Sequence, residues 1–177
     1  MRPDVIRPTP FSKVGTTRNG GGEMRGDLSK GGTRGFGGAM TYSETISLST
    51  EGFSDIIDIT DRVDSVVGHS KIIDGLVTVF CPGSTGSVTT IEYEPGVLRD
   101  LQKAIEKIVP SDVPYEHDRR WGDGNGFSHV RAALMKPSLS IPLIKGRLSL
   151  GTWQQIVFID FDNRRRERNL FVHILGD

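Results

Sequence analysis

The sequence contains little cysteine: Cys81 is the only one in 177 residues. A single thiol excludes an internal disulfide, and this usage is typical of proteins in a reducing compartment. Cys81 also ends an apolar run, so we interpret it as a buried thiol rather than a nucleophile. We therefore expect a cytoplasmic protein.

Long apolar runs are absent as well. No stretch approaches the roughly 18 residues that a membrane-spanning helix needs, and the N-terminus lacks the apolar centre of a secretory signal. Charge of one sign is not in excess either, since 22 Lys and Arg residues balance 22 Asp and Glu residues. We therefore expect neither a nucleic acid nor a membrane as the partner.

Apolar side chains are scarce in the first 40 residues, which contain ten glycines. Such a segment cannot bury enough surface to offset the entropy that is lost on ordering. It holds seven basic and three acidic residues, a net charge of +4, which leaves −4 for residues 41–177. We predict a disordered, glycine-rich basic tail over residues 1–40, solvated rather than bound to anionic partners. One folded domain is predicted over residues 41–177.

The rest of the sequence has mostly the pattern of strands. Alternation of apolar and polar residues, or short β-branched runs, predicts eight strands. They lie over residues 41–49, 56–59, 76–81, 88–93, 138–142, 143–150, 153–161 and 169–175. Helices are predicted after Thr60 and over residues 95–109, and a third, short pattern places Val130, Ala133 and Leu134 on one apolar side. We predict an α+β fold: a single compact domain dominated by a mostly antiparallel β-sheet or sandwich, with two to three helices.

Two loops between predicted strands can be interpreted in more than one way. Residues 82–87 are all small, and they could cradle an anion with their backbone N–H groups or form a plain turn. Residues 163–168 are a charged hairpin tip. We interpret the arginines of this tip as a solvated turn rather than a binding patch, because charge runs usually mark a wet surface.

The densest group of reactive side chains lies at residues 116–129. This stretch holds two of the four histidines, three acidic groups, two arginines and three alternating glycines. Such a density of titratable groups beside flexible backbone is costly for a purely structural loop. We interpret the stretch as the functional site.

His117 and His129 are separated by eleven residues that include a glycine-rich loop. This spacing allows both rings to converge on one point. With Glu92 or Asp118 they would form a facial site for a divalent metal, Mg or Zn, with positions left open for water or a phosphate oxygen. The alternative is a hydrogen-bonded pair of structural histidines.

Gly122, Gly124 and Gly126 alternate directly before a helix that is predicted to begin near Ser128. Backbone N–H groups at a helix N-terminus bind anions, although a glycine loop with Asn125 is equally an ordinary start of a helix. Arginines nearby could clamp a phosphate through two N–H groups each. The predicted substrate- and phosphate-binding residues are Arg119, Arg120, Gly124, Asn125, Gly126, Ser128, Arg131 and Trp153. Trp153 could stack on a flat ring of a ligand, but a core or interface position is the usual one for such an aromatic.

Several short motifs resemble the YjbQ family, whose members are often described as secondary thiamine-phosphate synthases. They are His117, Gly124-Asn125, Ser128-His129, Pro137-Ser138-Leu139 and Gly146 with Gly151-Thr152-Trp153-Gln154. The resemblance covers residues 41–177. It implies a compact sheet-rich fold, a homotrimer with sites near the subunit boundaries, and a small phosphorylated molecule as ligand. It also implies an activity that joins a pyrimidine pyrophosphate to a thiazole phosphate.

The chain departs from the family at Gly83, where members commonly carry a histidine. The family's histidine cluster is thereby reduced to His117 and His129, and Glu92 matches an acidic position. If the activity applies, pyrophosphate leaves the pyrimidine methylene and the thiazole nitrogen attacks that carbon. The catalytic residues would be His117, Asp118, Asp123 and His129, and the metal ligands His117, His129 and Glu92. Two other functions remain open: a non-catalytic trimeric protein that binds a small molecule or phosphate, and a metal-dependent hydrolase.

Overall fold

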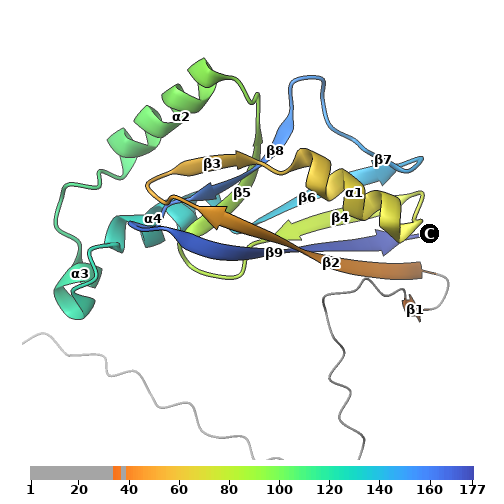
Figure 1. Ribbon diagram of the computed structural model, residues 1–177, viewed down its shortest axis with the longest axis horizontal. Coiled ribbons are helices and arrows are strands. Elements are labelled where there is room, and N and C mark those ends of the chain that lie inside the picture. Colours follow the sequence, from red (N-terminus) through yellow and green to blue (C-terminus); the bar gives the residue numbers. More distant parts are fainter. Residues whose placement is uncertain (1–33, 37–38) are drawn as a thin grey trace, which may run out of the picture.

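A computed structural model describes residues 34–36 and 39–177 (Figure 1). Most of the predicted disordered tail therefore lies outside the described residues. The strand β1 (Arg34–Phe36) lies within the stretch that we predicted to be disordered, and it pairs antiparallel with β2 (Ala39–Thr50).

The larger of two sheets has six antiparallel strands in the order β1-β2-β9-β4-β6-β7. Its remaining members are β4 (Gly75–Phe80), β6 (Ser138–Ile144), β7 (Arg147–Leu148) and β9 (Arg166–Gly176). The strand β9 lies between β2 and β4, so the C-terminal strand is at the centre of the sheet. Alternate residues of β9 are buried from Leu170 onward, as the sequence pattern predicted.

The smaller sheet has three antiparallel strands in the order β3-β8-β5. They are β3 (Asp55–Asp58), β5 (Gly86–Ile91) and β8 (Gln155–Asp160). Ile156 and Phe158 of β8 belong to the core between the two sheets, whereas Val157 and Ile159 belong to a second cluster on the other face. The strand β8 is therefore buried on both faces, which explains its nearly continuous apolar sequence.

Four helices complete the described part of the chain: α1 (Thr60–Ser70), α2 (Pro95–Ile108), α3 (Glu116–Trp121) and α4 (Gly126–Met135). Val63, Val66 and Val67 of α1 join the core between the sheets. Ile105 of α2 and Ala132 of α4 pack on the outer face of the small sheet. In Figure 1, α1 lies at one end of the molecule and α3 and α4 at the other. None of the helices among the described residues is long and apolar enough to cross a membrane.

The predicted α+β class, built on antiparallel sheets packed as a sandwich, is confirmed. Two details differ. The sequence did not predict α3, so the number of helices is four rather than two to three. The predicted strand over residues 143–150 is instead the end of β6 and a tight return to β7, because the chain reverses at Lys145 and Gly146 with φ of 53° and 72°.

The helix α4 faces the opposite way from the prediction. Val130 and Leu134, expected on the packed side, are 41% and 59% exposed. Ser128 and Arg131 are buried instead, because each has a backbone carbonyl to bind: Ser128 Oγ donates to the Phe161 oxygen at 2.6 Å and Arg131 Nε to the Val109 oxygen at 3.0 Å. Apolar periodicity alone could not reveal these partners.

Candidate functional site

A cleft of about 400 Å³ opens at the end of the sandwich that carries α3 and α4 (Figure 1). It lies where β8 ends, β9 begins and the loop from β4 to β5 passes. The lining residues are Gly83, Ser84, Thr85, His117, Trp121, Asp123, Asn125, His129, Asp162, Arg166 and Arg168. Three stretches that are distant in the sequence, residues 83–85, 117–129 and 162–168, thus meet at one place.

The floor of the cleft is an ion pair that joins the two sheets. Asp160, at the end of β8, is fully buried and accepts hydrogen bonds from Arg168 of β9, from Nε at 2.7 Å and from Nη2 at 2.7 Å. Thr50 of β2 donates a further bond of 2.5 Å to the same carboxylate. Such a bidentate pair fixes the guanidinium plane and keeps both charges satisfied away from water.

A second pair lies beside the first. Asp162 is 1% exposed, and its Oδ2 accepts hydrogen bonds from Arg166 Nε at 2.9 Å and Thr85 Oγ1 at 3.0 Å. Thr85 Oγ1 in turn accepts a bond of 2.8 Å from Arg168 Nη2, which links the two pairs. Burial acts to lower the pKa of Arg168, but the hydrogen bond and charge of Asp160 outweigh it and raise that pKa. Arg168 therefore stays charged.

The arginines of residues 163–168 do not all form the solvated turn that we predicted. Arg164 and Arg165 are exposed, but Arg166 and Arg168 belong to β9 and turn inward with Leu170. A signal for this exists in the sequence: the alternation that buries Leu170 and Val172 continues backward to residues 168 and 166. We missed it because a run of like charges suggested a wet surface.

His117 and His129 converge, as predicted. His117 is on α3 and His129 on α4, and their ring centroids are 4.3 Å apart with the planes tilted by 40°. His117 Nε2 also lies 3.3 Å from Asp123 Oδ2 in the loop between the helices. Gly122 ends α3 with a φ of 69°, which lets the chain turn back within four residues.

The pKa of His129 is lowered from its ordinary value. Burial is the main cause and the nearby His117 adds to it, while the charges of Asp123, Asp162 and Asp118 act in the opposite direction. A lowered pKa leaves the imidazole neutral at neutral pH. His129 can therefore accept a proton or a hydrogen bond at one ring nitrogen.

The glycine loop before α4 does not offer the free anion site that we predicted at Gly124, Gly126 and Ser128. Asp118 Oδ1 accepts the N–H of Gly126 at 2.8 Å, and the backbone oxygen of Asn125 accepts the N–H of Ser128 at 2.9 Å. A Cβ at Gly126 would lie 2.4 Å from Cβ of Tyr115, so this glycine is needed for close packing. Asp118 thus positions the loop rather than lining the cleft.

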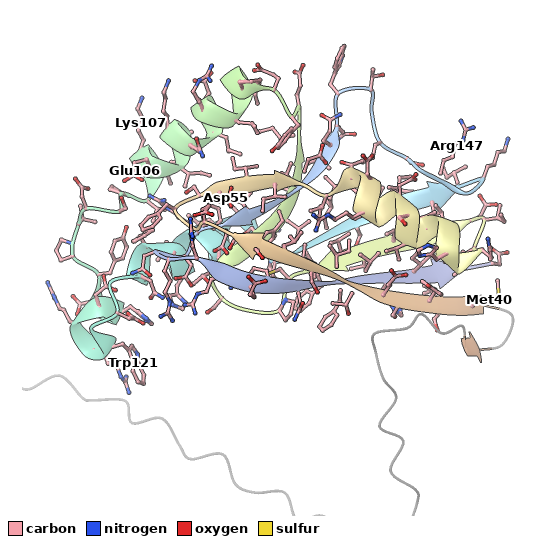
Figure 2. The ribbon with its side chains drawn as sticks, in the orientation of Figure 1. Met40, Asp55, Glu106, Lys107, Trp121 and Arg147 are labelled. Atoms are coloured by element: carbon pink, nitrogen blue, oxygen red, sulfur yellow. The ribbon has the colours of Figure 1, made fainter. Side chains whose placement is uncertain are left out.

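The predicted arginine clamp is not assembled. Arg119 pairs with Glu116 on the surface, and the guanidinium of Arg120 lies 5.4 Å from the ring centre of Trp121, which Figure 2 shows on α3. Arg131 is 3% exposed and is held on the far side of α4 by Glu106 and the Val109 oxygen. Arg166 and Arg168 occupy the cleft instead.

Trp153 and Glu92 lie outside the cleft as well. Trp153 is 69% exposed in the turn before β8, so it is not in the core of this chain. Glu92 follows the end of β5, seven residues after Thr85, which corresponds to about 20 Å along a strand. Trp121, which we did not predict, is the tryptophan that lines the cleft.

The residues present do not fit the metal site that we predicted from His117, His129 and Glu92. Glu92 is too far away, and His117 faces the carboxylate of Asp123. Within residues 34–36 and 39–177, no three His, Cys, Asp or Glu side chains are grouped so that they could hold a metal ion. Besides Asp123 and Asp162, the cleft has the N–H groups of Arg166 and Arg168 and two imidazoles tilted by 40°, and N–H donors suit an anion better than a cation.

Gly83 leaves part of the cleft without a side chain. Its φ is 128°, and a Cβ at this position would lie 3.7 Å from Arg168 Nη1. Arg168 uses Nε and Nη2 for Asp160 and Thr85, whereas Nη1 has no hydrogen-bond partner among the described residues. The two N–H groups of Nη1 therefore lie beside Gly83 without a partner among the described residues.

The comparisons with known proteins agree with this fold. A family model described as UPF0047 protein YjbQ-like matches residues 44–177. The chain belongs to the YjbQ family. The resemblance inferred from the sequence motifs is thereby confirmed.

Relatives from bacteria and archaea share most of the YjbQ domain. A UPF0047 protein of Archaeoglobus fulgidus is 42% identical over 123 residues, which is 70% of this chain and 94% of that protein. The UPF0047 protein YugU of Bacillus subtilis is 30% identical over 134 residues, 75% of this chain and 98% of its own length. A crystal structure of a YbjQ-like protein of unknown function from Sulfolobus solfataricus superposes with a TM-score of 0.75 and 30% identity, covering 78% of this chain and 99% of that one.

Proposed function

We propose that the cleft binds a small phosphorylated molecule and that the protein is a transferase of the thiamine-phosphate synthase type. It would join a pyrimidine pyrophosphate to a thiazole phosphate, as the family resemblance implies. The observation that carries the proposal is the unpartnered Nη1 of Arg168, which faces the space left by Gly83 in the same cleft as the neutral His129.

The arginines support anion binding because they are held in place before any ligand arrives. Two bonds to Asp160 and one to Thr85 fix Arg168, so little side-chain entropy is lost when Nη1 binds a phosphate oxygen. Arg166, which is about one-third exposed and paired with Asp162, offers further N–H donors beside it. The volume of about 400 Å³ is within the range of small-molecule sites.

The proposed reaction needs placement and charge stabilisation more than proton transfer. The bond between the pyrimidine methylene and a pyrophosphate oxygen breaks, and its electron pair leaves with the pyrophosphate. The lone pair of the thiazole nitrogen forms the new bond to that methylene carbon. Arg166 and Arg168 would stabilise the charge that grows on the departing oxygens. Trp121 and the imidazole pair offer flat surfaces on which the two rings can stack.

Binding without turnover is a second candidate, and Gly83 is the observation that favours it. The cleft has the two imidazoles of His117 and His129, but it has Gly83 where family members commonly carry a third histidine. It can therefore bind a phosphate and yet lack a catalytic group. The metal-dependent hydrolase finds no support in the geometry, since the described residues provide no three-ligand group.

Titration calorimetry with pyrophosphate tests the proposal. Arg168→Lys keeps a positive charge beside Asp160 but removes Nη1, so we expect affinity for pyrophosphate to fall at least about tenfold. Arg165→Lys is the matched control, because Arg165 is exposed and pairs with Glu51 outside the cleft. Equal affinity in Arg168→Lys and the unchanged protein would contradict the anion site.

Mass spectrometry of the full-length protein with both substrates then separates the two candidates. If the unchanged protein forms thiamine phosphate, and Arg168→Lys loses both this product and pyrophosphate binding, the transferase is supported. Pyrophosphate binding without any product supports the non-catalytic binding protein instead.

A further inference from the structure

We propose that the ligand of the cleft carries, besides its phosphate, a hydrogen-bond donor such as an amino or hydroxyl group, which Asn125 and Asp162 recognise. This inference rests on the proposed phosphate site and names the second chemical group of the same ligand. The phosphate would bind at Arg168, and the donor would bind at two acceptor oxygens in the wall of the cleft.

Asn125 supplies the first of these oxygens. It lies between α3 and α4, lines the cleft and is 7% exposed. Its Oδ1 is buried and has no hydrogen-bond partner. The backbone of Asn125 is fixed, because its carbonyl accepts the N–H of Ser128 at the start of α4. The backbone that carries this side chain is therefore held in place, and the bonding capacity of the side-chain oxygen is unused.

Asp162 supplies the second. Its Oδ2 is fully used by Thr85 and Arg166, whereas its Oδ1 is buried without a partner. Asp162 is 1% exposed and also lines the cleft. In the part of the chain that the structure describes, these are the two buried side-chain polar atoms that lack a partner, and both belong to the same cleft.

A buried acceptor without a donor is unfavourable by about 1–3 kcal/mol, so native proteins rarely retain one without a use. An ionised carboxylate only accepts hydrogen bonds, so the group that satisfies Asp162 must be a donor. The side-chain oxygen of Asn125 is likewise an acceptor. Because Arg166 and Arg168 already balance Asp160 and Asp162, either a neutral or a charged donor is compatible with the site.

The test compares phosphate esters that differ in one group. Affinities of the unchanged full-length protein are measured by calorimetry for ω-aminoalkyl and ω-hydroxyalkyl phosphates of increasing chain length, each beside the alkyl phosphate of equal length. Inorganic phosphate is titrated separately to establish the anion site. We expect that at one chain length a donor-bearing ester binds at least about tenfold more tightly than its alkyl partner.

Asn125→Leu should reduce this preference clearly below that of the unchanged protein, because Asp162 alone remains as an acceptor. Asn169→Leu is the control for the same chemical change, since Asn169 is exposed and bonds to Ser47 on the outer sheet face. If Asn125→Leu does not fold, Asn125→Asp keeps the size and two acceptor oxygens and should keep the preference. Loss of the preference in Asn125→Asp, or its persistence in folded Asn125→Leu, would overturn the inference.

The results distinguish this inference from the proposed function. If inorganic phosphate binds but every donor-bearing ester matches its alkyl partner, ordered water satisfies the two oxygens. The inference then fails and the phosphate site stands. If no phosphate compound binds, both fail.

Discussion

His129 is surrounded by groups that oppose one another electrostatically. Burial and His117 lower its pKa, and Asp123, Asp162 and Asp118 partly offset them. The unfolded chain therefore binds a proton at a higher pH than the folded chain does. The stability that neutral His129 contributes is fully present above its ordinary pKa of about 6.5 and is lost as the pH falls below that value.

The loss of this stability at low pH gives a prediction for thermal melts between about pH 5 and pH 8. The melting temperature of the unchanged protein should fall more steeply on acidification than that of His129→Gln. Glutamine does not titrate, so the variant binds no proton at this position on unfolding. His173→Gln serves as a control, because His173 is exposed and bonds to Ser43 on the outer face of the large sheet. Parallel curves for the unchanged protein and His129→Gln would contradict the prediction.

Single residues show what the sequence could and could not reveal about the site. The convergence of His117 and His129 was predictable as a possibility, because a glycine-containing connection of this length can turn back and bring both rings together. The role of Arg131 was not, because its partners, the Val109 oxygen and Glu106, come from the end of α2. Cys81 was predicted to be buried and is; burial raises its pKa to about 11, so the thiol stays protonated at neutral pH.

At the scale of elements, an ion pair rather than apolar packing connects the end of β8 with the beginning of β9. Asp160 is the last residue of β8, and its partner Arg168 is the third residue of β9. Removing one member leaves the other buried and unpaired, which typically lowers the free energy of unfolding by about 3–5 kcal/mol. Removing both leaves no such charge.

We therefore predict strong coupling in a double-mutant cycle. Asp160→Leu and Arg168→Leu should each lower the free energy of unfolding by about 3–5 kcal/mol, and the double variant should lose clearly less than their sum. Chemical denaturation with urea provides the measurement. Additive losses would show that the pair contributes through separate interactions, with Thr50 and Thr85 for example, rather than through its own charges.

Elements were predictable where local pattern and packing agree. The strand β4, with its β-branched run, and the helix α2, begun by Pro95, follow the sequence closely. The helix α3 was missed because its six residues carry no apolar periodicity and none of them is buried. The orientation of α4 was wrong because two of its inward residues are polar and are held by carbonyl groups from distant segments.

At the scale of the whole molecule, the large sheet is covered on one face. Val77, Val79, Val172 and Ile174 point into the core, and the residues that alternate with them point outward. These outward residues include Leu76, Phe80, Phe171 and Leu175, each between 40% and 48% exposed. Register places Phe80 opposite Phe171 and Leu76 opposite Leu175, so this face has two apolar pairs, with Thr78 and His173 between them. An exposed patch of this kind is typical of a protein interface.

We propose that this outer sheet face is where copies of the chain meet in the homotrimer that the family resemblance implies. Light scattering should then report a mass of three chains of 19.4 kDa each at micromolar concentration. Phe171→Glu places a charge in one of the two apolar pairs, so the mass should fall to that of one chain while the variant stays folded. Ile108→Glu is the control: Ile108 is 72% exposed on α2, away from this face, and the trimer should persist. A stable monomer of the unchanged protein would refute the assembly, and a trimeric Phe171→Glu would move the interface to another surface.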